Sequence, residues 1–438
     1  MRGRSRQQLS FGDGFIDPSL FSLDEELTQV DSLLTDRKLL APFEEVFDPT
    51  MGRPGTPIDV YLRMLYLKFR WGLSYEEVEH EVRERIPWRF FCHLSLQDTV
   101  PDATTLIKLN QRFGEERIAT LNKLLVKHLI KTKSIKPRRI RIDSTTLEAN
   151  ITYPTDITLM HQVVKTLTRT AQKLGQKVAN HTRATKRALA QMGASLKSKS
   201  KDKKARLHKS LRATSRLAQD TLAQCRTALK RLKRRQGTSS LQQRFEQHLA
   251  VAEQLLEQTE QKLAGCASIP ERLVSFYDPE ARPICKGKLA KPTEFGRTLQ
   301  LVQDASGLLL DYEIHLGNPS DKEQLLPLTK RFKKHFGRAP TELAADKGYY
   351  RQDNLTKLKE LGVRRAGIAK IGRLTGMERR RQKSRWFKRL FRFRCGMEAS
   401  ISMLKRCFGL GKILARGSPS TAIWVGLAIL SYNLWQMT

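Results

Sequence analysis

Three acidic residues, Asp143, Asp346 and Glu398, stand where a carboxylate indicates chemistry more readily than structure. Asp143 ends an alternating run and Asp346 ends an apolar run, so both are expected at the ends of β-strands. Glu398 lies in a helical pattern just past a dense basic stretch. Carboxylate oxygens suit Mg²⁺, an ion that keeps open positions for water and phosphate. Two such ions can activate an attacking oxygen and stabilise a leaving oxygen, so these residues are candidate metal ligands for a phosphodiester reaction.

The segments around these carboxylates predict an α/β catalytic domain with a mixed sheet and flanking helices. Two of the expected strands form a hairpin pattern around a short turn that contains Gly307. A helix to about Phe336 precedes the strand that ends at Asp346. The expected strands are residues 139–143, 298–304, 308–314, 343–346 and 363–369.

The helix of Glu398 has two distinct faces. Its apolar stripe consists of Met397, Ile401, Leu404 and Phe408, at helical spacing. The neighbouring face carries Arg394, Glu398, Ser402 and Lys405. The helix is therefore expected to bury one side and to present Arg394, Glu398 and Lys405 together. An ordinary ion pair between Arg394 and Glu398, four residues apart, is the structural alternative.

The segment before Glu398 is basic and aromatic. Residues 370–394 contain 11 Lys or Arg and one acidic residue. The aromatic residues between them are Trp386, Phe387, Phe391 and Phe393. Basic side chains bind phosphates and aromatic rings stack on unpaired bases, so this pattern favours contact with a nucleic acid.

The composition points to the same kind of partner. The chain has 438 residues, with 80 Lys or Arg against 44 Asp or Glu, a net charge of +36. Such an excess favours a polyanion, above all a nucleic acid, although charge alone does not separate an enzyme from an architectural protein. The six cysteines form no Cys-x-x-Cys pair and are expected as thiols in a reducing cytosol. No secretory signal follows Met1, and the apolar segment 422–435 is expected to be a buried helix, not a membrane span.

Two helical regions are expected outside the catalytic strands. Residues 58–131 contain a capping box at Ser74 and Glu77 and a second helix start at Asp102. They predict a helix-turn-helix-like DNA-binding module or a small bundle for dimer contacts, and the pattern leaves both open. Residues 160–236 contain 22 Lys or Arg and two acidic residues.

The basic stretch should form long helices that break at Gly237–Ser240 and continue in a helix over 241–263. We expect an antiparallel helical hairpin that grips DNA or clasps another subunit. The structural alternative is a solvated pair of charged helices. The DNA interpretation is favoured because so one-sided a charge repels itself without counter-ions.

The signature residues of the last segment resemble a known family. Arg394, Glu398 and Lys405 match the spacing of the Tyr-x2-Arg-x3-Glu-x6-Lys signature found in one branch of the DDE transposases of bacterial insertion sequences. Phe391 occupies the Tyr position, so this chain lacks a hydroxyl there. Further similar motifs are Gly52-Arg53-Pro54, Ile142–Thr145, Asn150–Asp156, Asp278–Pro283 and Ala345–Tyr349.

The resemblance implies a ribonuclease H-like catalytic domain in which Asp143, Asp346 and Glu398 are the catalytic, metal-binding triad. It implies two Mg²⁺ ions, for which Mn²⁺ can substitute, with Asp143 bridging both. The residues expected on DNA are Arg394, Lys405, Lys347, Trp386 and Arg385. Four other carboxylates compete for the metal role, namely Asp278, Asp304, Asp311 and Asp321.

The resulting hypothesis is a transposase that binds terminal inverted repeats and catalyses DNA cleavage and strand transfer. Its partners would be the double-stranded DNA of the transposon ends and of the target. The active complex would contain a homodimer. The protein would act in the bacterial cytoplasm, at the nucleoid. A non-catalytic DNA-binding protein and a ribonuclease H-like nuclease are the alternatives. The expected division is a helical N-terminal DNA-binding or dimerisation domain (1–135), a first catalytic part (136–155), a helical insertion (156–270) and the catalytic remainder (271–438).

Overall fold

The computed structural model describes residues 17–48, 51–52, 55–197, 199–233, 239–285 and 292–438. Met1, Arg53 and Pro54 of the sequence motifs, and Gly237 and Thr238 of the expected helix break, lie outside these residues. The chain forms two compact units. The first comprises Met1–Glu148, Thr298–His315 and Pro319–Thr438, and the second comprises Ala149–Arg297 and Leu316–Asn318.

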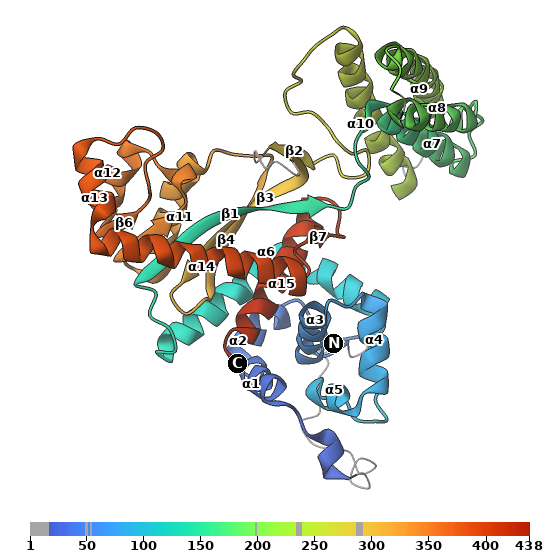
Figure 1. The fold of residues 1–438 in the computed structure, drawn as a ribbon. Helices are drawn as coiled ribbons and strands as arrows, with labels where there is room; N and C mark the ends of the chain where they lie inside the picture. Colours follow the sequence, from blue (N-terminus) through green and yellow to red (C-terminus); the bar gives the residue numbers. More distant parts are fainter. Residues whose placement is uncertain (1–16, 49–50, 53–54, 198, 234–238, 286–291) are drawn as a thin grey trace. The chain divides into compact units, whose positions relative to one another are not determined.

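The sheet contains the five predicted strands together with β2 and β7, which were not predicted (Figure 1). Its order is β2-β3-β1-β5-β6, while β4 pairs with β3 and β7 pairs with β1. The pairs β1–β5 and β5–β6 are parallel and β2–β3 is antiparallel, so the sheet is mixed. The strands are β1 (Arg139–Ala149), β2 (Arg282–Cys285), β3 (Thr293–Asp304), β4 (Leu309–Leu316), β5 (Glu342–Ala345), β6 (Arg365–Gly367) and β7 (Lys412–Ile413).

The expected hairpin, β3 and β4, is therefore confirmed, and so is the strand before Asp346. One expectation was wrong, because β1 does not end at Asp143 but continues to Ala149. Residues 144–149 keep β-forming Thr and apolar side chains with a buried pattern, so the strand has reason to continue. The strand expected over 363–369 is shorter and forms only β6.

The N-terminal helices form as their capping residues predict. The capping box at α4 is complete, because the N–H of Glu77 donates to Oγ of Ser74 (3.0 Å) and the N–H of Ser74 donates to Oε2 of Glu77 (2.7 Å). Asp102 caps α6 through the N–H of Thr105 (2.6 Å). The elements are η2 (Pro18–Phe21), α1 (Glu25–Leu34), α2 (Arg37–Glu44), α3 (Ile58–Trp71), α4 (Tyr75–Glu84), α5 (Ile86–Phe91) and α6 (Ala103–Lys131).

The C-terminal helix α15 (Ser418–Trp435) is the expected buried helix, and it packs against α3 and α6. These helices and the sheet share one hydrophobic core, which contains Leu65 of α3, Leu125 of α6, Ile142 of β1 and Leu430 of α15. The helical segment before residue 135 therefore packs as part of the same unit as β1 and β5. Among the described residues, none of the helices combines the length and the apolar character that a bilayer crossing requires.

The remaining helices of the first unit include α14, the helix of Glu398. They are α11 (Asp321–Phe336), η3 (Lys347–Tyr349), α12 (Gln352–Leu361), α13 (Gly376–Lys383) and α14 (Arg385–Cys407). Helix α14 packs against β5 and β6 and runs across the sheet in Figure 1. The predicted stripe of α14 is confirmed, because Met397, Leu404 and Phe408 are buried and Ile401 is partly buried.

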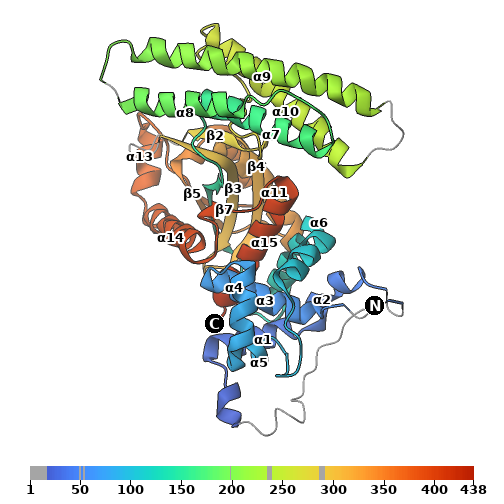
Figure 2. The same ribbon diagram turned by 90° about the vertical axis from the view of Figure 1, so that its right-hand side faces the viewer.

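The second unit corrects the expected two-helix hairpin. The basic stretch forms three helices, and the next segment adds a fourth to make a bundle with its own core (Figure 2). They are α7 (Asp156–Lys173), α8 (Thr182–Lys197), α9 (Lys203–Lys233) and α10 (Ser240–Leu263). Helix α7 supplies Met160, Val163 and Leu167 to a core that α10 completes with Phe245 and other apolar residues. The charged helices are thus supported by buried apolar faces and are not a solvated pair.

A buried charge cluster ties α1, α3 and the loop after α5 together. Arg63, whose side chain is fully buried, donates to Oδ1 of Asp31 (2.6 Å) and lies 3.6 Å from Oδ2 of Asp59. His93 contacts the same carboxylates, with Nε2 3.0 Å from Asp31 and Nδ1 3.2 Å from Asp59. Burial opposes protonation of His93, but the hydrogen bonds to Asp31 and Asp59 outweigh it and raise its pKa above the usual value.

This cluster predicts a loss of stability as the pH rises. A His whose pKa is raised by folding stabilises the folded state fully below its unfolded pKa of about 6.5. This stabilisation is lost as the pH rises through the folded pKa. We expect the free energy of unfolding to fall over this window by about 1.4 kcal/mol for each unit by which folding raises the pKa. Denaturant unfolding with linear extrapolation, repeated between pH 6 and 9, measures this change.

The matched control is His93→Asn. The backbone of His93 has φ 56°, which Asn adopts readily, and the Asn side chain does not titrate in this range. The difference between wild type and His93→Asn isolates the contribution of the imidazole. Parallel stability curves for the two proteins would show that His93 is not the titrating group.

Candidate active site

Asp143 lies within β1 and Asp346 directly follows β5, the strand beside it. In the parallel pairing of β1 with β5, Ile142 is opposite Ala345, so each aspartate follows directly on a paired residue. Neighbouring strands are about 4.8 Å apart, which brings the two carboxylates within reach of one ion. Strand β5 ends at Ala345 while β1 continues to Ala149, so Asp143 lies at the point of β1 where its partner strand β5 ends. The side chain of Asp346 is 44% exposed.

Arg394 on α14 joins Asp346 to Glu398. Its Nη1 is 3.6 Å from Oδ1 of Asp346, and its Nη2 is 3.3 Å from Oε1 of Glu398. Burial opposes the charge of Arg394, but the negative charges of Asp346, Asp143 and Glu398 contribute to a net rise of its pKa. Arg394 therefore contacts two of the three predicted carboxylates directly, and Asp143 acts on it through its charge. The i,i+4 pair of Arg394 with Glu398 forms, but it is part of this larger group.

The donor set suits a hard divalent cation, since it consists of three carboxylates of which Asp346 and Glu398 are substantially exposed. In their present positions, no three His, Cys, Asp or Glu side chains of the described residues converge closely enough to hold a metal. Arg394 instead compensates the charge of the acids, and its Nε is buried without a hydrogen-bond partner. A metal at this site would replace the contacts of Arg394 with the carboxylates.

Two glycines allow α14 to approach the sheet closely. A Cβ at Gly367 on β6 would lie 2.6 Å from Cβ of Leu390, and a Cβ at Gly396 would overlap Nη1 of Arg141. Arg141 on β1 donates from Nη1 to the carbonyl oxygen of Phe393 (2.9 Å), so it ties the strand of Asp143 to the helix of Glu398. The position of Glu398 thus depends on this close approach.

A second anchor holds the same helix from β5. Glu342 accepts hydrogen bonds from Arg139 (2.7 Å), Arg389 (2.6 Å) and Arg365 (3.3 Å), which belong to β1, α14 and β6. The sequence interpretation missed these supporting residues. The available signal was a glycine inside the strongly helical pattern around 396, since such a glycine usually has a packing reason.

Replacing Gly367 with Ala should therefore impair the site without touching it. The added Cβ meets Cβ of Leu390, which is close to its own helix backbone, so α14 must move away from β6. A displacement of about 1 Å can cost about 100-fold in rate. Rates of metal-dependent DNA cleavage, with circular dichroism to confirm folding, measure the effect. Gly376→Ala is the control, because a Cβ there meets no atom within 4 Å; equal rates in the two variants would contradict the positioning role of α14.

The residues expected to contact DNA differ in their exposure to solvent. Lys347 and Arg385 are exposed, whereas Trp386 is partly buried, with its ring edge-on to Phe387 at 5.7 Å and near the guanidinium of Arg365 at 5.9 Å. Lys405 is partly buried and lines a separate pocket further along α14.

Phe391 stands at the position of the signature tyrosine. Its side chain is 44% exposed, and the guanidinium of Arg394 lies 5.5 Å from the ring centroid. The ring can therefore support the guanidinium by cation–π contact, without a hydroxyl.

Three of the four competing carboxylates have structural partners. Asp278 is buried in a two-pronged ion pair with Arg297, at 2.8 and 3.0 Å. Asp304 closes the β3–β4 turn by accepting the N–H of Leu308 (3.0 Å). Asp311 pairs with Arg331 at 2.5 Å. These contacts account for the three acids without a metal.

Asp321, at the start of α11, lies nearer the candidate site. Its Oδ1 accepts from Nε2 of Gln300 (2.9 Å), and Gln300 accepts from the hydroxyl of Tyr349. Burial raises the pKa of Tyr349, and the charges of Asp321 and Asp143 raise it further. Asp321 is thus connected to the surroundings of Asp143 through a buried hydrogen-bonded chain.

Comparison with known proteins identifies the family of the chain. Residues 18–112 match a transposase domain (DUF772), and residues 274–434 match a transposase DDE domain. The chain belongs to the DDE transposases of the insertion-sequence type. It is also 32% identical over 157 residues to the uncharacterized protein ORF8 in the nfe locus of Rhizobium meliloti, a match that covers 34% of this chain and 76% of that protein. No solved structure matches the chain significantly.

Membership of this family has three consequences. A DDE transposase domain acts on DNA, belongs to enzymes of transposition, and implies the use of a divalent metal ion. Asp346 and Glu398 lie within the matched DDE segment. Asp143 lies in neither matched segment, and the helices α7–α10 stand between its strand and the matched DDE segment along the chain. The pairing of β1 with β5 brings it back beside Asp346.

Proposed function

We propose that this transposase binds the terminal inverted repeats of its element and catalyses metal-dependent DNA cleavage followed by strand transfer. The observation that carries the proposal is the placement of Asp143 beside Asp346, with Glu398 connected to Asp346 through Arg394. The parallel pairing of these strands and the helix across them also support a ribonuclease H-like catalytic domain.

The three carboxylates would hold two Mg²⁺ ions, or Mn²⁺ in their place. Bound there, the ions would activate a water or a 3′-hydroxyl and stabilise the leaving oxygen of the phosphodiester. Arg394 has a distinct task in the protein alone, since it reduces the repulsion among three neighbouring acids. When those acids bind cations, the charge of Arg394 is available for a DNA phosphate.

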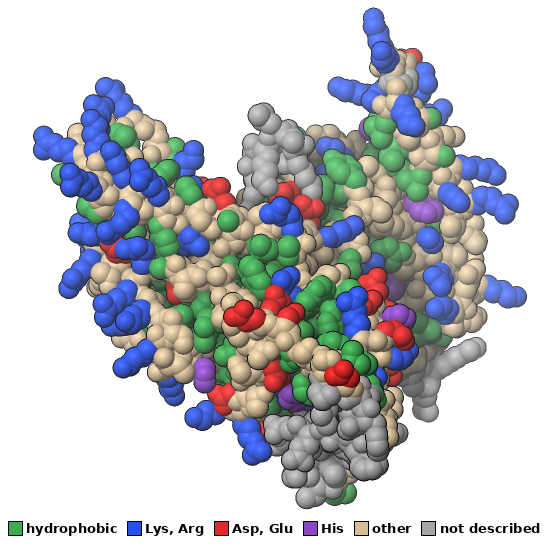
Figure 3. Space-filling model, turned by 60° about the horizontal axis from the view of Figure 1, so that its bottom comes forward, with side chains coloured by type: hydrophobic (Ala, Val, Ile, Leu, Met, Phe, Trp, Pro, Cys, Tyr) green, Lys and Arg blue, Asp and Glu red, His purple; other side chains and the backbone are tan. Residues whose placement is uncertain are grey.

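The basic surface of α13 and α14 supports DNA binding beside the site. Figure 3 shows Lys and Arg side chains gathered where α12 and α13 lie, at the left of the view. The exposed basic residues over 373–392 are Arg373, Arg379, Arg380, Lys383, Arg385, Lys388, Arg389 and Arg392. Such a surface contacts phosphates whatever the sequence, so it would position DNA and leave base recognition to other residues. We assign that recognition to the N-terminal helices, within the proposed segment 1–135.

The decisive experiment uses DNA that carries the inverted repeats flanking the coding region. Purified protein is incubated with labelled duplexes that end in these repeats, with Mg²⁺, with Mn²⁺, or with a chelator. We expect cleavage at the repeat end and joining to a target duplex, in the presence of either metal only. Binding without cleavage would favour the non-catalytic alternative, and cleavage that ignores the repeats and joins nothing would favour the nuclease.

The complex of the protein with repeat-end DNA also tests the oligomeric state. A homodimer in the active complex and action on the bacterial nucleoid remain proposals, as do the functional boundaries 1–135, 136–155, 156–270 and 271–438. Mass measurement of the protein bound to two repeat ends distinguishes one subunit from two.

A further inference from the structure

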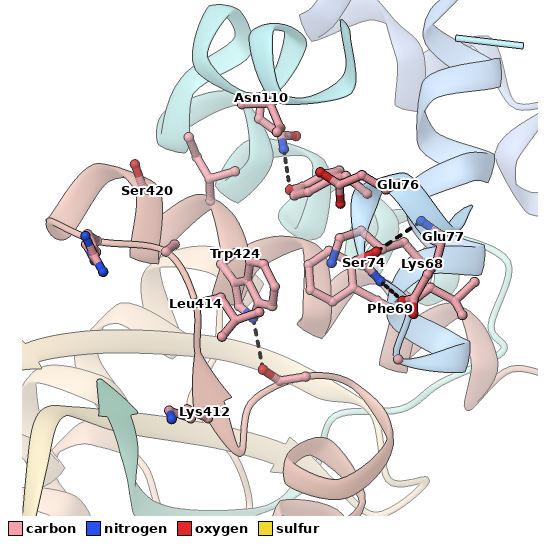
Figure 4. A pocket seen from close by; sticks show the side chains of 18 of the residues that line it. Lys68, Phe69, Ser74, Glu76, Glu77, Asn110, Lys412, Leu414, Ser420 and Trp424 are labelled. Carbon is pink, nitrogen blue, oxygen red and sulfur yellow. Dashed lines mark hydrogen bonds between the residues drawn. The ribbon is translucent and has the colours of Figure 1, made fainter. Parts of the chain in front are cut away.

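A second concave site lies in the first unit, apart from the three carboxylates. It is a pocket of about 660 Å³ formed by α3, the start of α4, α6, the segment after α14, and α15 (Figure 4). This is the size range of small-molecule and cofactor sites. Trp424 and Leu414 lie in its centre in Figure 4, and the glycines Gly409 and Gly411 form part of its wall.

The most unusual residue of this pocket is Lys68. Its side chain is buried, and its Nζ lies 4.2 Å from the ring centroid of Trp424, 4.6 Å from Tyr75 and 4.5 Å from Phe69. Within the described residues, no carboxylate approaches Lys68 to salt-bridge distance. The carboxylates of Glu76 and Glu77, which also line the pocket, act on Lys68 only from beyond that distance, and burial lowers the pKa of the ammonium to about 8. An anionic ligand in the pocket would supply a closer counter-charge.

The mouth of the pocket combines positive charge with exposed apolar surface. Lys405, Lys412 and Arg416 line it together with Lys68. Leu414 is 56% exposed and Ile107 is 37% exposed, although both are large apolar residues. A ligand that satisfies both features must carry an anionic group and a flat, weakly polar group, as a nucleotide does.

Helix α14 leads from the candidate active site to this pocket, because it carries both Glu398 and Lys405. Lys405 follows Glu398 by seven residues, which is about 10 Å along the helix axis. That distance corresponds to about three steps of a DNA strand at roughly 3.4 Å each. A strand held at the carboxylates can therefore place a nearby nucleotide in this pocket.

We propose that this pocket is a nucleotide subsite, in which Lys68 and Lys405 bind the phosphate and the apolar lining of Leu414, Ile107 and Trp424 receives the base. Its role in binding a strand of the transposon DNA rests on the proposed function. Its ability to bind a single nucleotide does not, because no carboxylate of the metal site takes part.

Calorimetric titration of the intact, metal-free protein with thymidine 5′-monophosphate tests the proposal. The measurement is made at about 0.15 M salt, which screens exposed charges. We expect saturable binding of one nucleotide per chain, and at least about tenfold weaker binding of thymidine or of inorganic phosphate alone. Absence of saturable nucleotide binding would overturn the proposal.

Two variants place the nucleotide in this pocket. Lys68→Met keeps the length of the side chain but removes its charge, and Leu414→Glu adds a negative charge at an exposed position that the fold does not need. Each should weaken binding at least about tenfold. The control Lys357→Gln, which removes an exposed charge on α12, should bind as wild type does. Wild-type affinity in Leu414→Glu, or equal loss in the control, would mean that the nucleotide binds elsewhere.

Asp143→Asn separates this inference from the proposed function. It should bind the nucleotide with wild-type affinity, because Asp143 is not part of the pocket. If the nucleotide binds but Asp143→Asn still cleaves DNA, the proposed triad fails and the subsite stands. If the triad variants abolish cleavage but no nucleotide binds, the subsite alone fails.

Discussion

Asp143→Asn, Asp346→Asn and Glu398→Gln should each reduce metal-dependent DNA cleavage by at least about 100-fold. Even residues outside the ligand shell of a metal change metal affinity or activity by about 10–100-fold, so loss of a ligand should do more. DNA binding should persist, because the exposed basic residues around the site remain in place. Single-turnover cleavage of repeat-end duplexes measures the first effect, and gel-shift titration without metal measures the second.

The controls for this prediction distinguish metal ligands from other nearby acids. Asp353→Asn removes an exposed carboxylate that pairs with Lys357, so it should cleave like wild type. Asp321→Asn tests the remaining competitor, whose hydrogen bond to Gln300 an asparagine oxygen can still accept. It should retain most of the activity. Full cleavage by a triad variant would remove that residue from the metal site, and complete loss in Asp321→Asn would add Asp321 to it.

The sequence was sufficient for features that local chemistry determines. The capping box of Ser74 and Glu77 and the turn that Asp304 closes depend on residues within a few positions. The buried stripe of α14 follows from helical spacing alone. These patterns also placed Asp346 at the end of its strand and Glu398 on a helix.

The sequence was insufficient where distant residues decide. The end of β1 was misplaced because Asp143 is the point where its neighbour β5 stops, which only the pairing reveals. The contacts of Arg141 with Phe393 and of Glu342 with Arg389 join segments more than 40 residues apart, so no local pattern contains them. Arg394 as the common partner of two carboxylates also required the packed structure.

The basic helices show a different source of error. The two-helix interpretation rested on the 22 Lys or Arg over 160–236. It did not use the apolar residues Met160, Val163 and Leu167, which pack into a bundle core. The apolar face of α7 was present in the sequence, but a two-helix interpretation left it without a partner. The consequence is practical, since deleting 160–263 would remove most of a packed bundle and not a separate arm.

Neutralising exposed charge on α9, with its core left intact, should therefore be the sharper test of the DNA-binding role. Lys204, Lys209 and Arg212 line a shallow basic groove of α9, and Arg216 follows one turn later. All four side chains are exposed. Each residue that neutralises a phosphate contributes about 0.9 to the slope of log affinity against log salt. Replacing all four with Gln should reduce the slope by about 3 to 4 if all of them contact DNA.

A control variant must distinguish the loss of phosphate contacts from a general loss of positive charge on α9. Arg226 and Lys233 on the same helix are paired with Glu253 and Glu246, so replacing these two with Gln should change the slope little. Preference for the repeat ends should survive in both variants, because phosphate contacts carry no sequence information. Gel-shift titrations over several salt concentrations, with repeat and scrambled duplexes, measure both quantities. An unchanged slope in the four-residue variant would place α9 off the DNA and favour a contact between subunits, whereas loss of repeat preference would assign base recognition to this bundle and not to the N-terminal helices.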